Sequence, residues 1–177
     1  MGTADSIRQN IYLIKQVKPR HVLVLSGDHI YKMDYGLLLQ YHLEKKAHMT
    51  VSLLEARKDL AHEMGVAQVD DQFRIRGFQE KPKSDVKTIP GDPQHVLASM
   101  GIYLFQTETL LELLQSREEE DFGSAIIPSS LESHKVYAYP YNRSNRIKDY
   151  VHITLEDGSR EERLETRMRD SSYWRDV

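Results

Sequence analysis

The stretch HVLVLSGD, residues 21 to 28, decides the fold class of this chain. Its apolar residues occupy both faces of an extended segment, which is the pattern of a parallel strand covered on both sides. The strand gives way at Ser26 to Gly27 and Asp28. A turn explains Gly27, but it does not explain why a carboxylate, that of Asp28, stands at the carboxyl end of a buried strand.

Helical and extended patterns alternate around this strand. Residues 3 to 17 repeat apolar side chains at helical spacing, with Thr3 as the expected N-cap. Asp34 is the expected cap of a second helix, which runs to residue 47, and MTVSLLEA, residues 49 to 56, is the next strand. This β-α-β order predicts a doubly wound α/β sheet.

The second half of the chain is richer in strands. GVAQVD and FRIRGFQEK, joined by two polar residues, predict an antiparallel hairpin. The proline-rich stretch after it predicts an exposed loop. The remaining elements expected are a strand over 95–105, a helix over 107–116, a short helix near Pro128 and a strand over 135–141.

Residues 142 to 172 form a strongly charged segment, interpreted as an insertion or a hairpin. YVHITLEDG, residues 150 to 158, suits a solvated hairpin that turns at Asp157-Gly158. Such a charged excursion is more often a solvated face than a binding site. We therefore treat residues 1–177 as one partial domain.

Composition limits the functional classes. The chain has 177 residues, 40% of them hydrophobic and 29% charged, which suits one folded domain. A net charge of −3 gives no basic footprint for nucleic acid. The absence of cysteine excludes disulfides, thiolate zinc sites and cysteine nucleophiles. We see no signal peptide and no apolar run of membrane-spanning length, so a soluble cytoplasmic protein is expected.

Asp28 is the first candidate for chemistry. Ligands of open α/β sheets bind beyond the carboxyl ends of the strands, where Asp28 is expected to lie. A carboxylate there can hold Mg²⁺, which takes one or two carboxylates together with substrate phosphates. The alternative, that Asp28 only turns the chain or caps a helix, is equally weighted. His29 is interpreted as a structural or supporting residue.

Three further groups of residues are suggestive. Glu80 and Lys81 stand side by side at a strand end, where they could accept from sugar hydroxyls and neutralise a phosphate. Ser99 lies close to a strand glycine, a residue type that marks a close approach to the backbone. Asp176 follows an aromatic residue and an arginine near the chain end. Each is weak on its own.

Seven motifs in register resemble one family. They are GTADSIRQN, LSGDHIYKMDY, MGVAQVD, FQEKP, ASMGIYLF, DFGSAIIP and YWRDV. Together they resemble the catalytic domain of the ADP-glucose pyrophosphorylase (glucose-1-phosphate adenylyltransferase) family of sugar nucleotidyltransferases. The resemblance implies a Rossmann-like fold with a mixed, mostly parallel sheet and flanking helices. It also implies synthesis of ADP-glucose and pyrophosphate from ATP and glucose 1-phosphate, for glycogen or starch.

The resemblance also implies roles for single residues. Asp28 and Asp176 resemble the two carboxylates that bind the catalytic Mg²⁺. Glu80 resembles the residue that holds the sugar hydroxyls. Lys81 resembles the residue that holds the phosphate of glucose 1-phosphate, and it is therefore named with Asp28 as catalytic.

Other implied positions line the substrates. Gly65 and Ser99 resemble residues of the glucose pocket, and Thr3 and Ala4 resemble residues near the nucleotide. The family's Gly-rich phosphate loop and its C-terminal β-helix are not found in these 177 residues. We therefore expect a fold incomplete at both ends, probable inactivity of this segment alone, and a homo-oligomeric parent enzyme, a tetramer.

Two alternatives stay open. One is another sugar-1-phosphate nucleotidyltransferase with a different base or sugar. The other is a non-catalytic subunit that binds sugar phosphate and regulates or scaffolds a complete partner.

Overall fold

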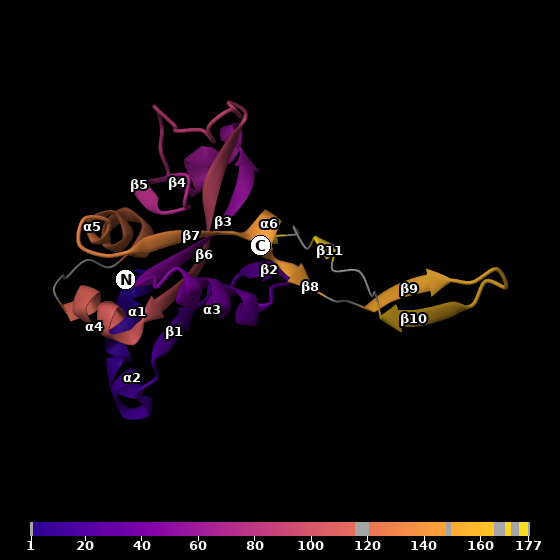
Figure 1. Ribbon diagram of the computed structural model, residues 1–177, viewed down its shortest axis with the longest axis horizontal. Coiled ribbons are helices and arrows are strands. Elements are labelled where there is room, and N and C mark those ends of the chain that lie inside the picture. The colour runs from indigo at the N-terminus through magenta and orange to yellow at the C-terminus, as the bar shows by residue number, and fades with distance from the viewer. Residues whose placement is uncertain (1, 116–120, 148–149, 165–168, 171–173, 177) are drawn as a thin grey trace.

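The computed structural model describes residues 2–115, 121–147, 150–164, 169–170 and 174–176. It is an α/β fold with a central mixed sheet flanked by helices (Figure 1), as the sequence predicts. The helices are α1 (Thr3–Gln9), α2 (Ile11–Val17), α3 (Tyr35–Glu44), α4 (Thr107–Gln115), α5 (Ile127–Ser130) and α6 (Tyr141–Ser144). A 3₁₀ segment, η1 (Lys58–Glu63), and a π-helical turn, η2 (Phe122–Ile126), complete them.

Six strands form the main sheet, in the order β5-β4-β6-β3-β7, with β1 paired to β6 off this path. The strands are β1 (His21–Val24), β3 (Met49–Arg57), β4 (Gly65–Val69), β5 (Ile75–Glu80), β6 (His95–Gln106) and β7 (Val136–Pro140). Short ladders outside it use β2 (His29–Tyr31), β8 (Arg146–Ile147), β9 (Tyr150–Thr154), β10 (Arg160–Leu164), β11 (Arg169–Asp170) and β12 (Trp174–Asp176).

The expected predominance of parallel pairing is wrong for the described strands. Only β3 and β7 pair in parallel, whereas β6 runs antiparallel to β1, β3 and β4. The reason is that β6 lies between β1 and β3 and separates two strands that would otherwise be parallel neighbours. Because β1 and β3 both oppose β6, they run in the same direction, but β1 ends opposite Tyr103 whereas β3 continues to a position opposite His95.

Strand β1 is apolar on both faces because it separates two cores. Val22 and Val24 pack with the core that contains residues of α1, α4 and one face of β6. Leu23 points the other way, into the core that α3 covers. The sequence correctly indicated two-sided burial, although each residue of β1 is only half-buried.

The N-terminal helix is interrupted. Asn10 has φ −109° and ψ 14°, and its side-chain amide donates to the Ser6 carbonyl at 2.8 Å. This local bond competes with the helix and divides the expected single helix 3–17 into α1 and α2. The N-cap is Gly2, so the expected cap role of Thr3 is wrong; Thr3 is the first helical residue.

Asp34 caps α3 as predicted. Its carboxylate accepts hydrogen bonds from the Gly36 amide at 2.8 Å and the Leu37 amide at 3.3 Å. These bonds satisfy two of the amide donors that a helix start leaves without partners. The helix ends at Glu44, earlier than expected.

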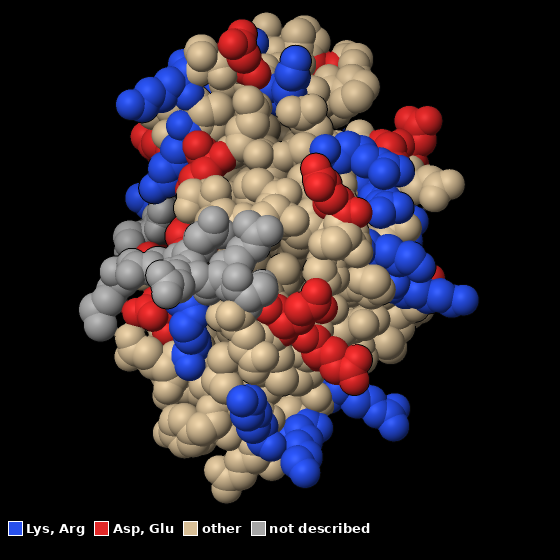
Figure 2. Space-filling model, turned by 90° about the vertical axis from the view of Figure 1, so that its left-hand side faces the viewer, with Lys and Arg blue, Asp and Glu red and all other residues tan. Residues whose placement is uncertain are grey.

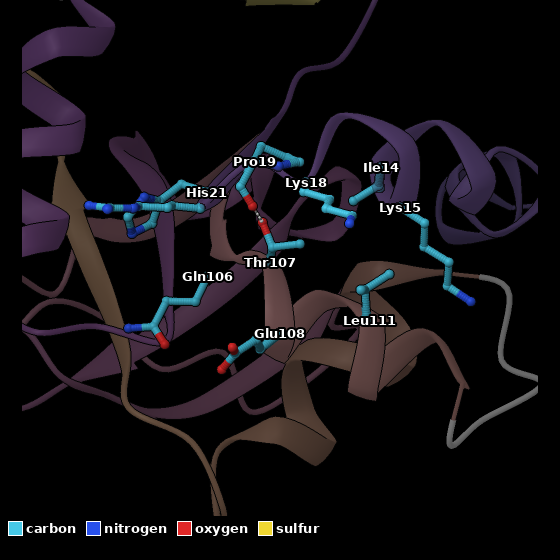
Figure 3. Close-up of a pocket in the computed structure, with 10 residues that line it drawn as sticks. Ile14, Lys15, Lys18, Pro19, His21, Gln106, Thr107, Glu108 and Leu111 are labelled. Carbon is cyan, nitrogen blue, oxygen red and sulfur yellow. Dashed lines mark hydrogen bonds between the residues drawn. The ribbon is translucent and has the colours of Figure 1, made fainter.

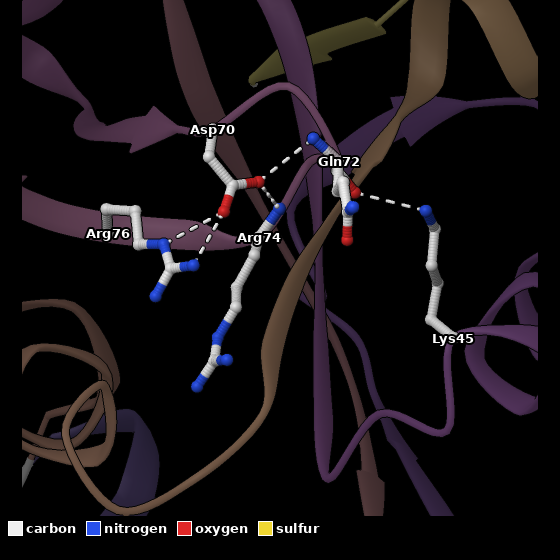
Figure 4. A network of polar contacts seen from close by, with 5 residues as sticks. All are labelled: Lys45, Asp70, Gln72, Arg74 and Arg76. Carbon is white, nitrogen blue, oxygen red and sulfur yellow. Dashed lines mark hydrogen bonds and ion pairs between the residues drawn. The ribbon is translucent and has the colours of Figure 1, made fainter.

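The predicted β4–β5 hairpin is present, and Asp70 organises its turn (Figure 4). One carboxylate oxygen of Asp70 accepts from the Gln72 and Arg74 amides, both at 3.0 Å, and the other accepts from Arg76 Nε at 2.9 Å. Lys45, just after α3, donates to the Gln72 carbonyl at 3.1 Å. The turn is therefore tied to the helix layer, and this fixes the strand that carries Glu80.

The charged tail contains the predicted hairpin. β9 and β10 pair antiparallel, and Gly158 takes the left-handed conformation, φ +81°, in the turn between them. Every residue of β10 is exposed, and the hairpin projects away from the sheet in Figure 1. Among the described helices, none has the length and apolar character needed to cross a membrane.

Candidate functional site

Asp28 lies between the end of β1 and the start of β2, at the edge of the sheet predicted for ligands. Its side chain is 65% exposed. Ser26 Oγ donates to Asp28 Oδ1 at 2.7 Å, and His29 Nε2 lies 3.6 Å from the same oxygen. The Ser26 hydroxyl is the main reason that the pKa of Asp28 lies below its usual value. Asp28 is therefore a charged, accessible carboxylate at neutral pH.

The chain end returns to Asp28 through a short ladder. β12 pairs antiparallel with β2, and the register sets Asp176 opposite His29 and Trp174 opposite Tyr31. The backbone of Asp176 thus lies across from the residue that follows Asp28. The two predicted metal ligands are brought to the same place, although the side chain of Asp176 is outside the described residues.

The oxygen-donor chemistry of this pair fits Mg²⁺. Within the described part of the chain, no group of three or more His, Cys, Asp or Glu residues could hold a metal ion. Mg²⁺ needs no such cage, because it usually keeps waters and binds one or two carboxylates with substrate phosphates. An exposed, ionised Asp28 with a second aspartate in register meets that requirement.

Glu80 lies between two glycines. A Cβ atom on Gly65 would come within 2.9 Å of Glu80 Oε2, and a Cβ atom on Gly123 would collide with the same carboxylate. Burial, together with the nearby Asp121 carboxylate, raises the pKa of Glu80, and the neighbouring Lys81 charge opposes this. Glu80, the residue predicted to bind the sugar, therefore lies in a recess that any side chain at position 65 or 123 would fill.

Lys81 is exposed beside Glu80. Its backbone has φ +45°, and its amide donates to the Met64 carbonyl at 3.1 Å. A non-glycine residue in this left-handed region is uncommon and often occurs near functional sites. The strand β5 therefore ends in a fixed turn that presents Glu80 and Lys81 in succession.

Ser99 and Tyr103 share the same strand face of β6. Ser99 Oγ lies 3.5 Å from the Tyr103 hydroxyl. Burial, with added repulsion from the Glu80 and Asp121 charges, raises the pKa of Tyr103 to about 12, so its hydroxyl stays protonated. The predicted pocket residue Ser99 is thus connected through Tyr103 to the Glu80 region.

Asp121 is a site residue that our sequence reasoning missed. Its Oδ1 accepts from the Gly123 amide at 2.9 Å and the Ser124 amide at 3.0 Å, while Oδ2 accepts from Thr3 Oγ1 at 3.2 Å. Burial would raise its pKa, but the Ser124 and Thr3 bonds outweigh burial and lower it. The available signal was an aspartate two and three residues before the Gly123 and Ser124 amides inside DFGSAIIP, the spacing of a capping residue.

A cleft of about 520 Å³ lies beside Asp28, and Glu80, Lys81, Ser99 and Asp121 are not among the residues that line it. Asp28 and Gly27 line one part of it, Tyr103 and Phe122 line another, and Thr3 is at its margin. Ala4, the other predicted nucleotide residue, is wholly buried in the core. Ala4 therefore does not line this cleft, in contrast to Thr3.

A second cleft, of about 640 Å³, lies at the opposite end of β1 (Figure 3). Lys15, Lys18 and His21 line it together with residues from the start of α4. The Thr107 hydroxyl, which also lines this cleft, donates to the Pro19 carbonyl at 2.7 Å. None of the predicted site residues reaches this cleft, because His21 begins the strand that Asp28 follows.

Charges of both signs are interspersed on the face of the molecule shown in Figure 2. Asp and Glu side chains occur within an otherwise uncharged central area, and Lys and Arg gather toward its margins. The surface seen from this side is therefore not dominated by one sign of charge.

Comparison with known proteins places this geometry in a family. The family model described as nucleotidyl transferase matches residues 1–177. A glucose-1-phosphate adenylyltransferase of Shewanella sp. (strain ANA-3) is 51% identical over 146 residues, which cover 79% of this chain and 34% of that protein.

Two other relatives match almost the whole chain. The glucose-1-phosphate adenylyltransferase of Alteromonas mediterranea is 42% identical over 99% of this chain and 37% of its own length. Glucose-1-phosphate adenylyltransferase 2 of Pseudoalteromonas atlantica is 42% identical over 99% of this chain and 38% of its own length. The chain thus spans about a third of the length of these relatives. By its full-length match, the chain belongs to the nucleotidyl transferase family.

Proposed function

We propose that this chain is part of the catalytic domain of a glucose-1-phosphate adenylyltransferase, which converts ATP and glucose 1-phosphate to ADP-glucose and pyrophosphate. The observation that carries the proposal is the β2–β12 ladder, which brings Asp176 opposite His29, next to Asp28 at the cleft. The relatives with 42% to 51% identity are named glucose-1-phosphate adenylyltransferases, and this supports the choice of substrates.

The reaction needs no protein nucleophile. A phosphate oxygen of glucose 1-phosphate attacks the α-phosphorus of ATP, and the bond from that phosphorus to the β-phosphate bridging oxygen breaks as pyrophosphate leaves. The protein must align two polyanions and offset the charge that develops. Bound Mg²⁺ supplies charge neutralisation at the phosphates. Asp28 and Asp176 would hold it.

The Glu80 recess would orient the sugar. The Glu80 carboxylate accepts from glucose hydroxyls, and Lys81 neutralises the phosphate of the same substrate. Gly65 and Ser99 shape the sugar pocket, and the nearby Asp121 fixes the wall opposite Gly65. Asp121 holds Thr3 through a hydrogen bond, so the sugar recess and the proposed nucleotide residues Thr3 and Ala4 share one support.

The wider setting follows from the proposed reaction and the family resemblance. ADP-glucose is an activated glucose, so the proposed product would feed glycogen or starch synthesis in the cytoplasm. A homo-oligomeric, tetrameric parent enzyme is part of the same proposal.

The test is pyrophosphate release with glucose 1-phosphate, Mg²⁺ and each of ATP, dTTP, UTP and GTP. Because this segment by itself is expected to be inactive, the assay uses a longer chain that restores the family's Gly-rich phosphate loop, from a sample whose circular dichroism shows a folded α/β protein. We expect release with ATP and with none of the other three nucleotides. Release with another nucleotide would identify a different sugar nucleotidyltransferase.

A folded chain without turnover would overturn the claim for this segment. Calorimetric titration with glucose 1-phosphate would then separate the two remaining readings. Binding that Glu80→Gln abolishes would indicate a sugar-phosphate-binding subunit, and no binding would reject a substrate role for the Glu80 recess.

A further inference from the structure

We infer that His29 is the positioning residue that holds Asp28 and Asp176 in register at the edge of β6. This inference rests on the proposed function, because it concerns how the two carboxylates of the metal site are kept in place. His29 itself is not assigned to the metal or to a substrate.

The first contact of His29 ties it to the centre of the sheet. Its Nδ1 atom lies 2.9 Å from the Met100 carbonyl oxygen. A carbonyl only accepts hydrogen bonds, so Nδ1 carries the proton and donates. Met100 is fully buried in the core beneath α3. The ring is therefore anchored to a rigid point of β6.

The second contact reaches the strand that carries Asp176. The rings of His29 and Trp174 meet edge to face, with centroids 4.9 Å apart and planes at 73°. Trp174 and Asp176 belong to the same three-residue strand, which pairs with β2 at His29. The imidazole thus sets the position of β12 through a ring contact as well as through the ladder.

Gly101 makes room for this arrangement. It has φ +68°, and a Cβ atom built on it would lie 3.2 Å from His29 Cε1. The side chain of His29 is only 12% exposed as a result. Its Nε2 edge lies 3.6 Å from Asp28 Oδ1, at the side of the cleft. One ring thereby contacts β6, β12 and the carboxylate of Asp28.

The site requires such an anchor because its own secondary structure is weak. β2 and β12 form a two-stranded ladder of three residues each, outside the main sheet. A two-stranded sheet is marginally stable by itself in water. Asp28 lies on an exposed connection before it. Catalytic carboxylates must be held within a fraction of an ångström, and an anchored neighbour provides that.

The test measures metal binding rather than turnover. Free Mn²⁺ is followed by electron paramagnetic resonance during titration of the wild-type chain and of four variants. Asp28→Asn removes a proposed ligand. His29→Phe keeps an aromatic ring against Trp174 but removes the donor to the Met100 carbonyl, whereas His29→Asn keeps a donor near the position of Nδ1.

The matched control is His95→Phe. Like His29, His95 has a hydrogen bond at Nδ1, 2.7 Å from Asp92 Oδ2, but it begins β6 and lies away from the cleft. We expect Asp28→Asn and His29→Phe each to weaken Mn²⁺ binding at least tenfold. His29→Asn, which keeps the donor but loses the ring, should weaken Mn²⁺ binding less than His29→Phe does, and His95→Phe should leave it unchanged.

Two results would overturn the inference in different ways. Normal Mn²⁺ binding by His29→Phe, with binding lost in Asp28→Asn, would reject the role of His29 and leave the metal site intact. Normal binding by Asp28→Asn, or no binding by wild type, would reject the metal site itself and the inference with it.

If His29→Phe does not fold, His29→Gln replaces it, because the side-chain amide of glutamine would lie beyond the position of Nδ1 and could not replace that donor. Binding equal to wild type in that variant would also reject the role.

Discussion

At the scale of single residues, the candidate site depends on glycines, because their missing side chains leave space that other groups occupy. Gly65 and Gly123 leave the volume that the Glu80 carboxylate occupies. Gly101 leaves the volume that the His29 ring occupies. Glycine is the one residue that lets other groups approach the backbone this closely. Substituting a glycine therefore tests the site without changing its charges, unlike substituting a charged residue.

We predict that Gly123→Ala lowers the affinity for glucose 1-phosphate at least tenfold, because the new methyl group would displace the Glu80 carboxylate. Gly77→Ala is the matched control. It lies on the same strand as Glu80, and its Cβ atom would meet only the Gln68 side chain, at 3.2 Å. Titration calorimetry measures both. Unchanged affinity in Gly123→Ala would show that Glu80 does not contact the sugar phosphate.

We expect Glu80 to lower the stability of the fold at neutral pH while it contributes to the binding of glucose 1-phosphate. Burial and Asp121 raise its pKa, so the folded state binds the proton more tightly than the unfolded state does. The free energy of unfolding then falls as the pH rises from the ordinary glutamate pKa through the raised one. We predict that Glu80→Gln unfolds at a higher temperature than wild type at pH 7, but not at pH 3, and that it binds glucose 1-phosphate more weakly. A lower midpoint at pH 7 would contradict this.

At the scale of elements, the local signals in the sequence were sufficient for most helices and strands but not for their partners. The Asp34 cap and the Asp157-Gly158 turn are short-range features, and both were predicted correctly. The β2–β12 ladder joins segments from the two ends of the chain, and neither three-residue strand has a pattern of its own. The position of β6 between β1 and β3 is equally non-local.

Helix α3 contains a buried histidine that should limit stability in acid. His42 is fully buried, and Thr50 Oγ1 lies 2.8 Å from its Nδ1. Burial, with smaller effects of His21 and His48, lowers its pKa from 6.5 to about 4. The unfolded chain thus binds more protons between these values, and stability is present above pH 6.5 and is lost as the pH falls toward 4.

We predict that this loss is smaller in His42→Gln, which cannot take up a proton. Urea unfolding at several pH values measures the free energy of unfolding. His62→Gln is the matched control, because it makes the same substitution at an exposed histidine. An identical acid slope in wild type and His42→Gln would assign the loss to other groups.

The β9–β10 hairpin should be dispensable for the rest of the fold. Its strands pair mainly with each other, and its charged side chains point into solvent. We predict that replacing residues 150–164 with a short Gly-Ser linker changes the unfolding midpoint by less than about 4 °C, the shift expected for roughly 1 kcal/mol in a chain of this size. A larger fall, measured by circular dichroism, would show that the hairpin supports the sheet.

At the scale of the whole molecule, the cleft beside Asp28 gathers residues from the N-terminal part and the middle of the chain. Thr3 comes from α1, Asp28 from the connection after β1, and Tyr103 from β6. The resemblance in the sequence indicated most of these positions, because their motifs are contiguous. It did not single out Asp121 or the anchoring of His29, because both depend on contacts between segments far apart in the chain.

The central claim is that Asp28 and Asp176 act together in adenylyl transfer. A double-mutant cycle tests it most directly. It is made in a longer chain that restores the family's Gly-rich phosphate loop, with pyrophosphate release from ATP and glucose 1-phosphate measured for wild type, Asp28→Asn, Asp176→Asn and the double variant. Residues that act as a unit are strongly non-additive. We predict that each single variant loses at least a hundredfold in rate and that the double variant loses little more. Additive losses, near-normal rates in either single variant, or no release by wild type would contradict the claim.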